Sequence, residues 1–143
     1  MNDITLRVET SHPTRPQNEH NDCGVCALSV ATGRPYIHVH QTTKEAGRKN
    51  KRGTPWHNAL EGLFKLGFKA TLQEMPRNVW QVRDLPRLFP QGRYVFVVYS
   101  TYGRTHAVAL IDGVVVDNGG LDSVYQRVHS IHKIEPFNAA DIL

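Results

Sequence analysis

Two cysteines lie three positions apart, as Cys23 and Cys26, at the start of a segment of small and apolar residues. Asp22 is a suitable N-cap and Gly33 a suitable residue just past the end, so we predict a buried helix over 23–32. Backbone N–H groups and the helix dipole favour a negative charge in the first turn of a helix. We therefore expect the Cys23 thiol to have a lowered pKa and nucleophilic character, and Cys26 to be a packing residue.

A thiolate catalyses acyl transfer only with a histidine beside it and a third group that orients the histidine. Segment 105–117 offers both, because Asp112 and Gly113 form a strong two-residue turn signal between two apolar runs. In the hairpin that this turn predicts, His106 and Asp117 are diagonal neighbours on one face. We therefore predict a hydrogen bond between the imidazole of His106 and the carboxylate of Asp117.

The remaining requirement is a donor for the oxyanion that forms during acyl transfer. Gln17 precedes Cys23 by six residues in a polar segment, so its side-chain amide can fold back to join the Cys23 backbone N–H. Asn118 is the alternative orienting residue for His106, since a one-residue slip of the hairpin would exchange it with Asp117. The sequence therefore offers a residue for every catalytic role, and the choice between Asp117 and Asn118 as the orienting residue stays open.

The string from Gln17 to Ala27, Q-N-E-H-N-D-C-G-V-C-A, resembles the start of papain-like cysteine peptidases. The resemblance is closest to the bacteriocin-processing C39 peptidase group. Segment 53–70, G-T-P-W-H-N-A-L-E-G-L-F-K-L-G-F-K-A, is similar to the second helix of that group. Segment 105–119, T-H-A-V-A-L-I-D-G-V-V-V-D-N-G, is similar to its histidine strand and acidic strand. The resemblance thus covers most of the chain in the right order.

By this resemblance Cys23 is the nucleophile, His106 the base and acid, Asp117 the orienting carboxylate and Gln17 the oxyanion donor. It implies a cysteine peptidase that hydrolyses a peptide or isopeptide bond, with glycine before the cleaved bond as in the group, and that needs no metal or organic cofactor. The expected partner is a protein or peptide substrate. The same residues also serve other papain-like acyl transferases and deamidases, so these remain alternatives.

Three residues are candidates for binding the substrate. Gly24, next to the nucleophile, has no side chain and would let the substrate approach the start of the helix closely. The same residue also fits a role in packing the helix. Tyr102 and Gly103 lie in the loop just before His106 and are candidates for lining a narrow cleft. Tyr102 also fits the role expected of the other aromatics, which are core or rim residues: Trp56, Trp80 and Tyr99.

Three readings from other classes compete with the peptidase. The C-x-x-C pair at a helix start is typical of a thiol-disulfide oxidoreductase, but no apolar strand directly precedes it. A zinc site would combine Cys23 and Cys26 with His38 and His40. The basic stretch 44–52 is a candidate contact for nucleic acid, but no aromatic residue interleaves it, so we expect a solvated face.

Composition and length bound these readings. The chain has 143 residues, 40% hydrophobic and 21% charged, which predicts one domain, with 1–16 as a short N-terminal arm. Net charge is +4 and no apolar run approaches the roughly 20 residues of a membrane span. Because the N-terminus has no signal-peptide core, we expect a cytoplasmic protein. Three biological settings fit that expectation: a processing enzyme, a host-directed effector and a phage-encoded factor.

The expected fold class is α+β, a papain-like arrangement of N-terminal helices packed on a C-terminal antiparallel sheet. Besides the helix at 23–32, apolar spacing and stop signals predict a helix over 55–66. Alternation and β-branched composition predict strands over 4–8, 68–72, 94–100, 105–111 and 114–117.

Overall fold

The computed structural model of the protein describes residues 6–8, 23–45, 56–74, 80–99, 105–117, 121 and 123–137. Its centre is a six-stranded sheet in the order β1-β5-β4-β3-β6-β2. Strand β1 runs parallel to β5, and every other neighbouring pair is antiparallel. The strands are β1 (Leu6–Val8), β2 (Phe68–Leu72), β3 (Arg93–Tyr99), β4 (Thr105–Ile111), β5 (Val114–Asp117) and β6 (Val128–Pro136).

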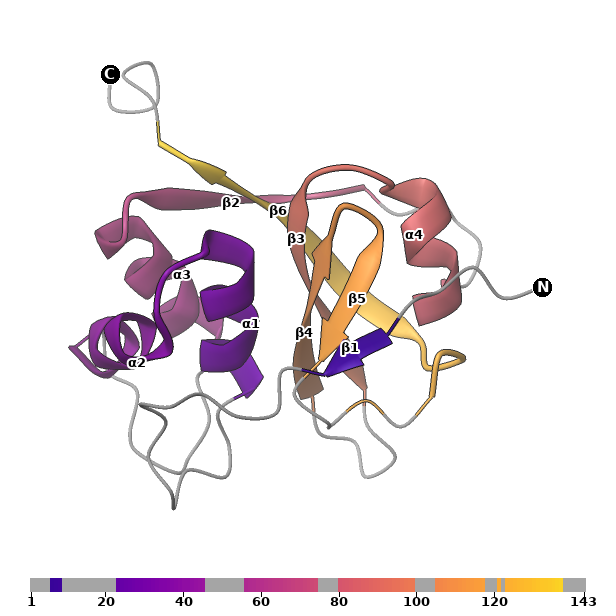
Figure 1. Ribbon diagram of the computed structural model, residues 1–143, viewed down its shortest axis with the longest axis horizontal. Helices are drawn as coiled ribbons and strands as arrows, with labels where there is room; N and C mark the ends of the chain where they lie inside the picture. Colours follow the sequence, from indigo (N-terminus) through magenta and orange to yellow (C-terminus); the bar gives the residue numbers. More distant parts are fainter. Residues whose placement is uncertain are drawn as a thin grey trace.

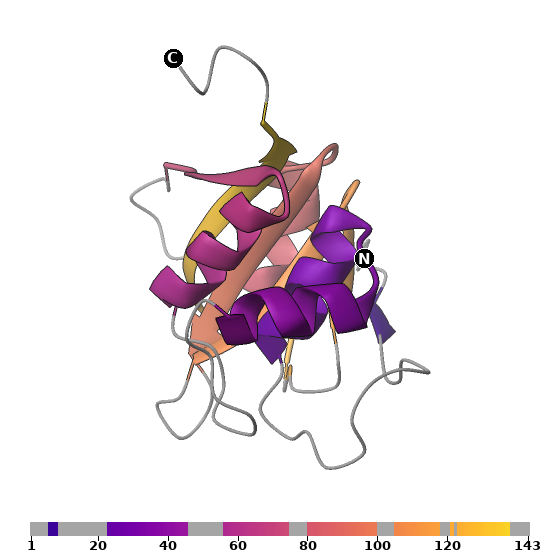
Figure 2. The ribbon, with the colours of Figure 1, turned by 90° about the vertical axis from the view of Figure 1, so that its left-hand side faces the viewer.

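Helices lie on both sides of this sheet (Figures 1 and 2). One side carries α1 (Cys23–Thr32), α2 (Tyr36–Glu45) and α3 (Trp56–Lys65), and the other carries a 3-10 turn (Val82–Asp84) that runs into α4 (Leu85–Leu88). The chain is therefore a mixed helix and sheet protein with a largely antiparallel sheet. The parallel pairing of β1 is a departure from the wholly antiparallel sheet that we expected.

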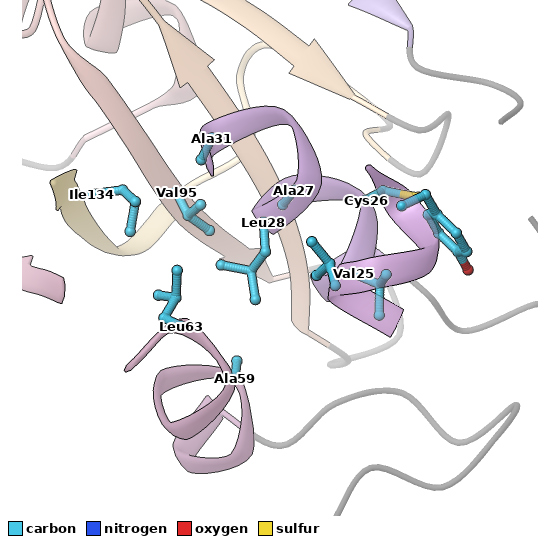
Figure 3. Packing of buried hydrophobic residues seen from close by; sticks show 11 residues of the cluster. Val25, Cys26, Ala27, Leu28, Ala31, Ala59, Leu63, Val95 and Ile134 are labelled. Carbon is cyan, nitrogen blue, oxygen red and sulfur yellow. The ribbon is translucent and has the colours of Figure 1, made fainter. Parts of the chain in front are cut away.

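The α1 helix is buried along almost its whole length against the sheet. Small residues at Gly24, Ala27 and Ala31 allow close packing, while Val25 and Leu28 are fully buried. Figure 3 shows the side chains of Val25, Ala27, Leu28 and Ala31 in one cluster with residues of α3 and the sheet. At the other end of the helix, the guanidinium of Arg93 in β3 donates to the carbonyls of Val30 and Ala31, at 3.2 and 3.4 Å. These contacts fix the helix that begins at Cys23.

The opposite face of the sheet buries a second apolar cluster. Its members come from segment 80–85, which includes the first residue of α4, and from strands β3, β4, β5 and β6: Trp80, Val82, Leu85, Tyr94, Phe96, Val98, Val108, Leu110, Val115, Val128 and Ile131. Trp80 is thus a core aromatic, as expected. Because β3, β4 and β5 are packed on both faces, they form a rigid support for side chains at their ends.

The turn between β4 and β5 is the predicted two-residue turn. Asp112 and Gly113 both have positive φ, at 47° and 79°, and Ile111 pairs with Val114 across the turn. The Asp112 carboxylate accepts a hydrogen bond from the Gly92 N–H at 2.9 Å, which ties the turn to the start of β3. The predicted register of this hairpin is therefore confirmed.

Replacing Gly113 with alanine is expected to destabilise the protein by about 1–2 kcal/mol, because an L side chain is disfavoured at positive φ. A Cβ there would meet the Pro90 carbonyl oxygen at 3.4 Å, an ordinary contact, so strain and not collision is the cause. Urea unfolding measures the loss. Gly113→Asn is the matched control, since asparagine tolerates this conformation. An equal loss in both variants would show that backbone strain is not responsible.

Helix α2 was not expected from the sequence. Its β-branched and histidine residues have weak helix propensity, so the sequence does not predict a helix here. The buried face of the helix consists of Tyr36, Val39, His40 and Thr43. These positions follow the spacing i, i+3, i+4 and i+7 of an amphipathic helix. Tertiary contacts with the neighbouring helices therefore decide the structure of this segment.

Strand β6 was also missed, because its apolar residues do not alternate. A bulge opposite Val97 and Val98 shifts the register of β6. As a result Val128 and Ile131 join one apolar cluster although they are three residues apart, while Ile134 joins the cluster on the other face. The period of two that identifies a strand is absent from the sequence for this reason.

Candidate active site

The candidate site lies where β4 and β5 separate. Their last paired residues are Ala109 and Val116. Beyond that pair β4 continues along β3, with His106 opposite Val98, while β5 continues along β1, with Asp117 opposite Val8. The sheet therefore opens at this end, and α1, which packs on β4, begins beside the opening.

His106 and Asp117 face each other across this opening. The His106 Nε2 lies 2.6 Å from the Asp117 Oδ1, and both residues are buried, with 9% and 5% of their surface exposed. The second carboxylate oxygen, Oδ2, accepts a hydrogen bond from the Leu121 N–H at 2.8 Å. Both oxygens are thus held, and the predicted contact between His106 and Asp117 is confirmed.

Cys23 lies beside His106, and the two side chains form a hydrogen bond. Since Nε2 is engaged by Asp117, Nδ1 is the ring nitrogen that remains for the thiol. A carboxylate at Nε2 favours the tautomer that carries its proton there, which leaves Nδ1 able to accept the thiol proton. The three side chains therefore form one chain from thiol to imidazole to carboxylate.

The environment of Cys23 stabilises its thiolate. Burial by itself raises the pKa of the Cys23 thiol, but four other interactions lower the pKa below its ordinary value. In order of size these are a hydrogen bond from His106, a hydrogen bond from the backbone of Ala107, the positive charge of His106 and a hydrogen bond from the backbone of Gly24. Backbone N–H groups donate such bonds, because only a donor stabilises the anion. The pKa is lowered, as the sequence predicted, but the largest lowering contribution comes from His106 and not from the helix N-terminus.

His106 shifts in the opposite direction. Burial lowers the pKa of its imidazole, but the hydrogen bonds to Asp117 and Cys23 and the negative charges of these partners raise the pKa to about 9. With the thiol pKa lowered and the imidazole pKa raised, thiolate and imidazolium coexist between the two values. The pair loses its negative charge as pH falls through the thiol pKa and its positive charge as pH rises through about 9.

Two backbone groups of the site were not foreseen. In the paired part of β4, Ala109 and Ile111 direct their N–H groups toward β5, and strand alternation gives Ala107 the same direction. Among the described residues β4 and β5 pair no further than Ala109 and Val116, and the backbone of Ala107 forms a hydrogen bond with the Cys23 thiol. The Leu121 N–H on Asp117 is the other group. Neither depends on a side chain, so no residue type in the sequence signals them.

Several predicted site residues lie outside the described part of the chain. These are Gln17, Tyr102, Gly103 and Asn118. Gly24 is buried as the second residue of α1, next to the nucleophile, and its substrate-binding role stays a prediction. Tyr99 is described, and it lies exposed at the end of β3 against the His129 ring, with ring centroids 5.0 Å apart. It is thus a rim aromatic, as expected.

The zinc alternative requires four residues that the structure does not gather. Within the described ranges, no group of three or more histidine, cysteine or acidic side chains is placed to hold a metal ion. His38 and His40 lie on α2, two residues apart, so they point away from each other around the helix. His40 is buried and stacks on Tyr36, while His38 is exposed. Cys26 is 6% exposed within the apolar cluster, as a packing residue would be.

The comparisons with known proteins add no assignment. No family model matches the chain, and a search of curated proteins finds no match. Of the described residues, no helix has the length and apolar character to cross a membrane. Of the basic stretch 44–52, the structure describes Lys44 and Glu45, the last two residues of α2, and Lys44 is exposed.

Proposed function

We propose that the protein is a papain-like cysteine peptidase, acting through the triad of Cys23, His106 and Asp117. One observation carries the proposal: a buried carboxylate orients an imidazole, and that imidazole bonds the thiol at the first residue of a helix. Each contact has a use in acyl transfer. A thiol-disulfide oxidoreductase would explain the two cysteines but would give the pairing of His106 with Asp117 no task.

The reaction follows from the positions of these groups. The Cys23 thiolate attacks the carbonyl carbon of the substrate, and the oxygen gains negative charge. The Cys23 N–H is among the first four of α1, which have no acceptor within the helix, and is one donor for that charge. Gln17 is the second donor in this proposal. The His106 imidazolium gives its proton to the leaving amine, and the thioester remains.

Hydrolysis completes the cycle. Neutral His106 takes a proton from water, the water oxygen attacks the thioester carbonyl, and the Cys23 thiolate leaves while the imidazolium forms again. Asp117 stabilises the imidazolium in both half-reactions and holds the ring in place. We propose a protein or peptide as the acyl donor, with a peptide or isopeptide bond as the bond cleaved and glycine before it.

The papain-like fold is part of the proposal. Its support is the arrangement of a buried helix with cysteine at its first residue, further helices on the same face of the sheet, and histidine and aspartate on adjacent strands at the sheet's open end. This arrangement brings the nucleophile and the base from separate layers of the fold to one edge.

A substrate panel in ¹⁸O-labelled water tests the proposed reaction. The panel contains glycine-rich peptides, ubiquitin-like isopeptide conjugates and glutamine peptides, each with and without an added primary amine. A peptidase places ¹⁸O at a new carboxyl terminus, with no product from Cys23→Ala. Conversion of glutamine to glutamate without chain cleavage would replace the peptidase with a deamidase. No acyl transfer from any member, while Cys23 remains a reactive thiolate, would overturn the proposal.

A further inference from the structure

Acyl transfer uses one of the two cysteines in the chain and gives Cys26 no chemical task. Both cysteines of α1 are outside any disulfide. Cys23 is partly exposed at the start of the helix, whereas Cys26 is 6% exposed in the apolar cluster. An oxidant from solvent therefore reaches Cys23 first, and Cys26 is a second thiol held behind it.

The geometry of α1 places these two thiols within reach of each other. In an α-helix the Cα atoms of residues i and i+3 are about 5 Å apart, inside the range of about 4.4–6.8 Å found in disulfides. The side chains also share one face of the helix. Their Cβ atoms, about 5–6 Å apart, must approach to about 4 Å before a disulfide can close.

The start of α1 is where such a movement costs least. Cys23 is the first residue of the helix, and its N–H makes no bond within the helix, so a rotation of its backbone breaks fewer helical hydrogen bonds than a rotation further along α1. Gly24 follows it and has no side chain to restrict that rotation. Cys26 meanwhile is fixed by the buried part of α1, and the movement falls on Cys23 alone.

We propose that Cys23 is a site of reversible oxidation by hydrogen peroxide or an organic peroxide, with Cys26 as the resolving thiol. The Cys23 thiolate attacks one peroxide oxygen, the O–O bond breaks, and hydroxide or alkoxide leaves, giving a sulfenic acid on Cys23. The Cys26 sulfur then attacks the Cys23 sulfur. The S–O bond breaks, the hydroxyl leaves as water with the Cys26 proton, and a disulfide forms. An external dithiol reduces it and restores both thiols.

This disulfide protects the nucleophile. A sulfenic acid with no thiol beside it proceeds to sulfinic acid, which dithiols do not reduce. Capture by Cys26 stops the oxidation at a reversible stage and removes the Cys23 sulfur from His106. The loss of acyl transfer that follows depends on the proposed function, whereas formation of the disulfide does not.

The test exposes the protein to stepwise equivalents of hydrogen peroxide and maps the peptide that contains both cysteines by mass spectrometry. In the wild type we expect loss of two hydrogen atoms from this peptide, and full return of Cys23 alkylation after dithiothreitol. In Cys26→Ala we expect unchanged alkylation before peroxide, then addition of two oxygen atoms to Cys23 with no recovery. Cys26→Ser repeats the test with a side chain of nearly the same size as the thiol.

Equal accumulation of sulfinic acid in the wild type and in Cys26→Ala would overturn the inference, and so would disulfides only between molecules. The wild-type mapping stands on its own if a variant fails to fold. A reversible internal disulfide in a protein that cleaves no member of the substrate panel would support the inference and remove the proposed function.

Discussion

Replacing His106 with alanine is expected to lower peptide hydrolysis by about 10³-fold or more, because the thiol loses its proton acceptor and the leaving amine its proton donor. The same change should slow alkylation of Cys23 at neutral pH, since the hydrogen bond and positive charge that lower the thiol pKa both disappear. Steady-state kinetics on a cleaved peptide and the rate of iodoacetamide modification measure the two effects.

His106→Gln is the matched variant for this experiment. Alanine removes the hydrogen bond to Oδ1 of the buried Asp117 carboxylate, and the cost of about 1–3 kcal/mol in stability would be hard to separate from a loss of catalysis. The glutamine amide can donate to Asp117 but cannot take a proton from Cys23. We expect it to retain stability and to be as inactive as alanine. Substantial hydrolysis by a folded His106→Gln protein would remove His106 from the triad.

Replacing Asp117 with alanine is expected to lower hydrolysis by about 10²-fold or more. The carboxylate holds the imidazole at Nε2, and its hydrogen bond and charge raise the pKa of His106. Without it, the imidazolium should lose its proton at a pH below about 9, and the alkaline limb of the activity profile should move down. Kinetics across a pH series measure both changes.

Asp117→Asn separates orientation from charge. The asparagine carbonyl oxygen can still accept from Nε2 of His106, but its NH₂ group then meets the Leu121 N–H, and two donors face each other. We therefore expect activity between that of the wild type and the alanine variant, with the alkaline limb shifted as in alanine. Full activity in Asp117→Ala would contradict the orienting role and return attention to Asn118.

The contact between His106 and Asp117 and the start of α1 at Cys23 were predictable from short segments of the sequence. The turn at Asp112 and Gly113 set the register, and the register placed His106 beside Asp117 without knowledge of any other strand. Likewise the cap and stop signals gave α1, with Gly33 in the left-handed conformation just past its end, at φ 70°. The residue types of a short segment were sufficient to predict these two elements, because each is determined by residues that are close together in the sequence.

The rest depends on contacts between distant segments. Tyr36 and Val39 have weak helix propensity, and their packing in the core stabilises the helix that contains them. In β6, the bulge breaks the alternation of apolar residues by which a strand is recognised in a sequence. The hydrogen bond between the Ala107 backbone and the Cys23 thiol, like the parallel pairing of β5 with β1, joins segments that are far apart in the sequence. No short sequence pattern carries such information.

The pH dependence of alkylation at Cys23 tests the ion pair with His106 most directly. Iodoacetamide is applied across a pH series, and peptide mass spectrometry reads Cys23 against Cys26 as an internal control. Because the pKa of the Cys23 thiol is lowered, we expect fast modification to persist well below the roughly 8.5 of a free thiol, and to fall only as pH drops through that lowered pKa. In His106→Gln the midpoint should rise. A Cys23 thiol that titrates as an ordinary cysteine, unchanged by the loss of His106, would contradict the triad.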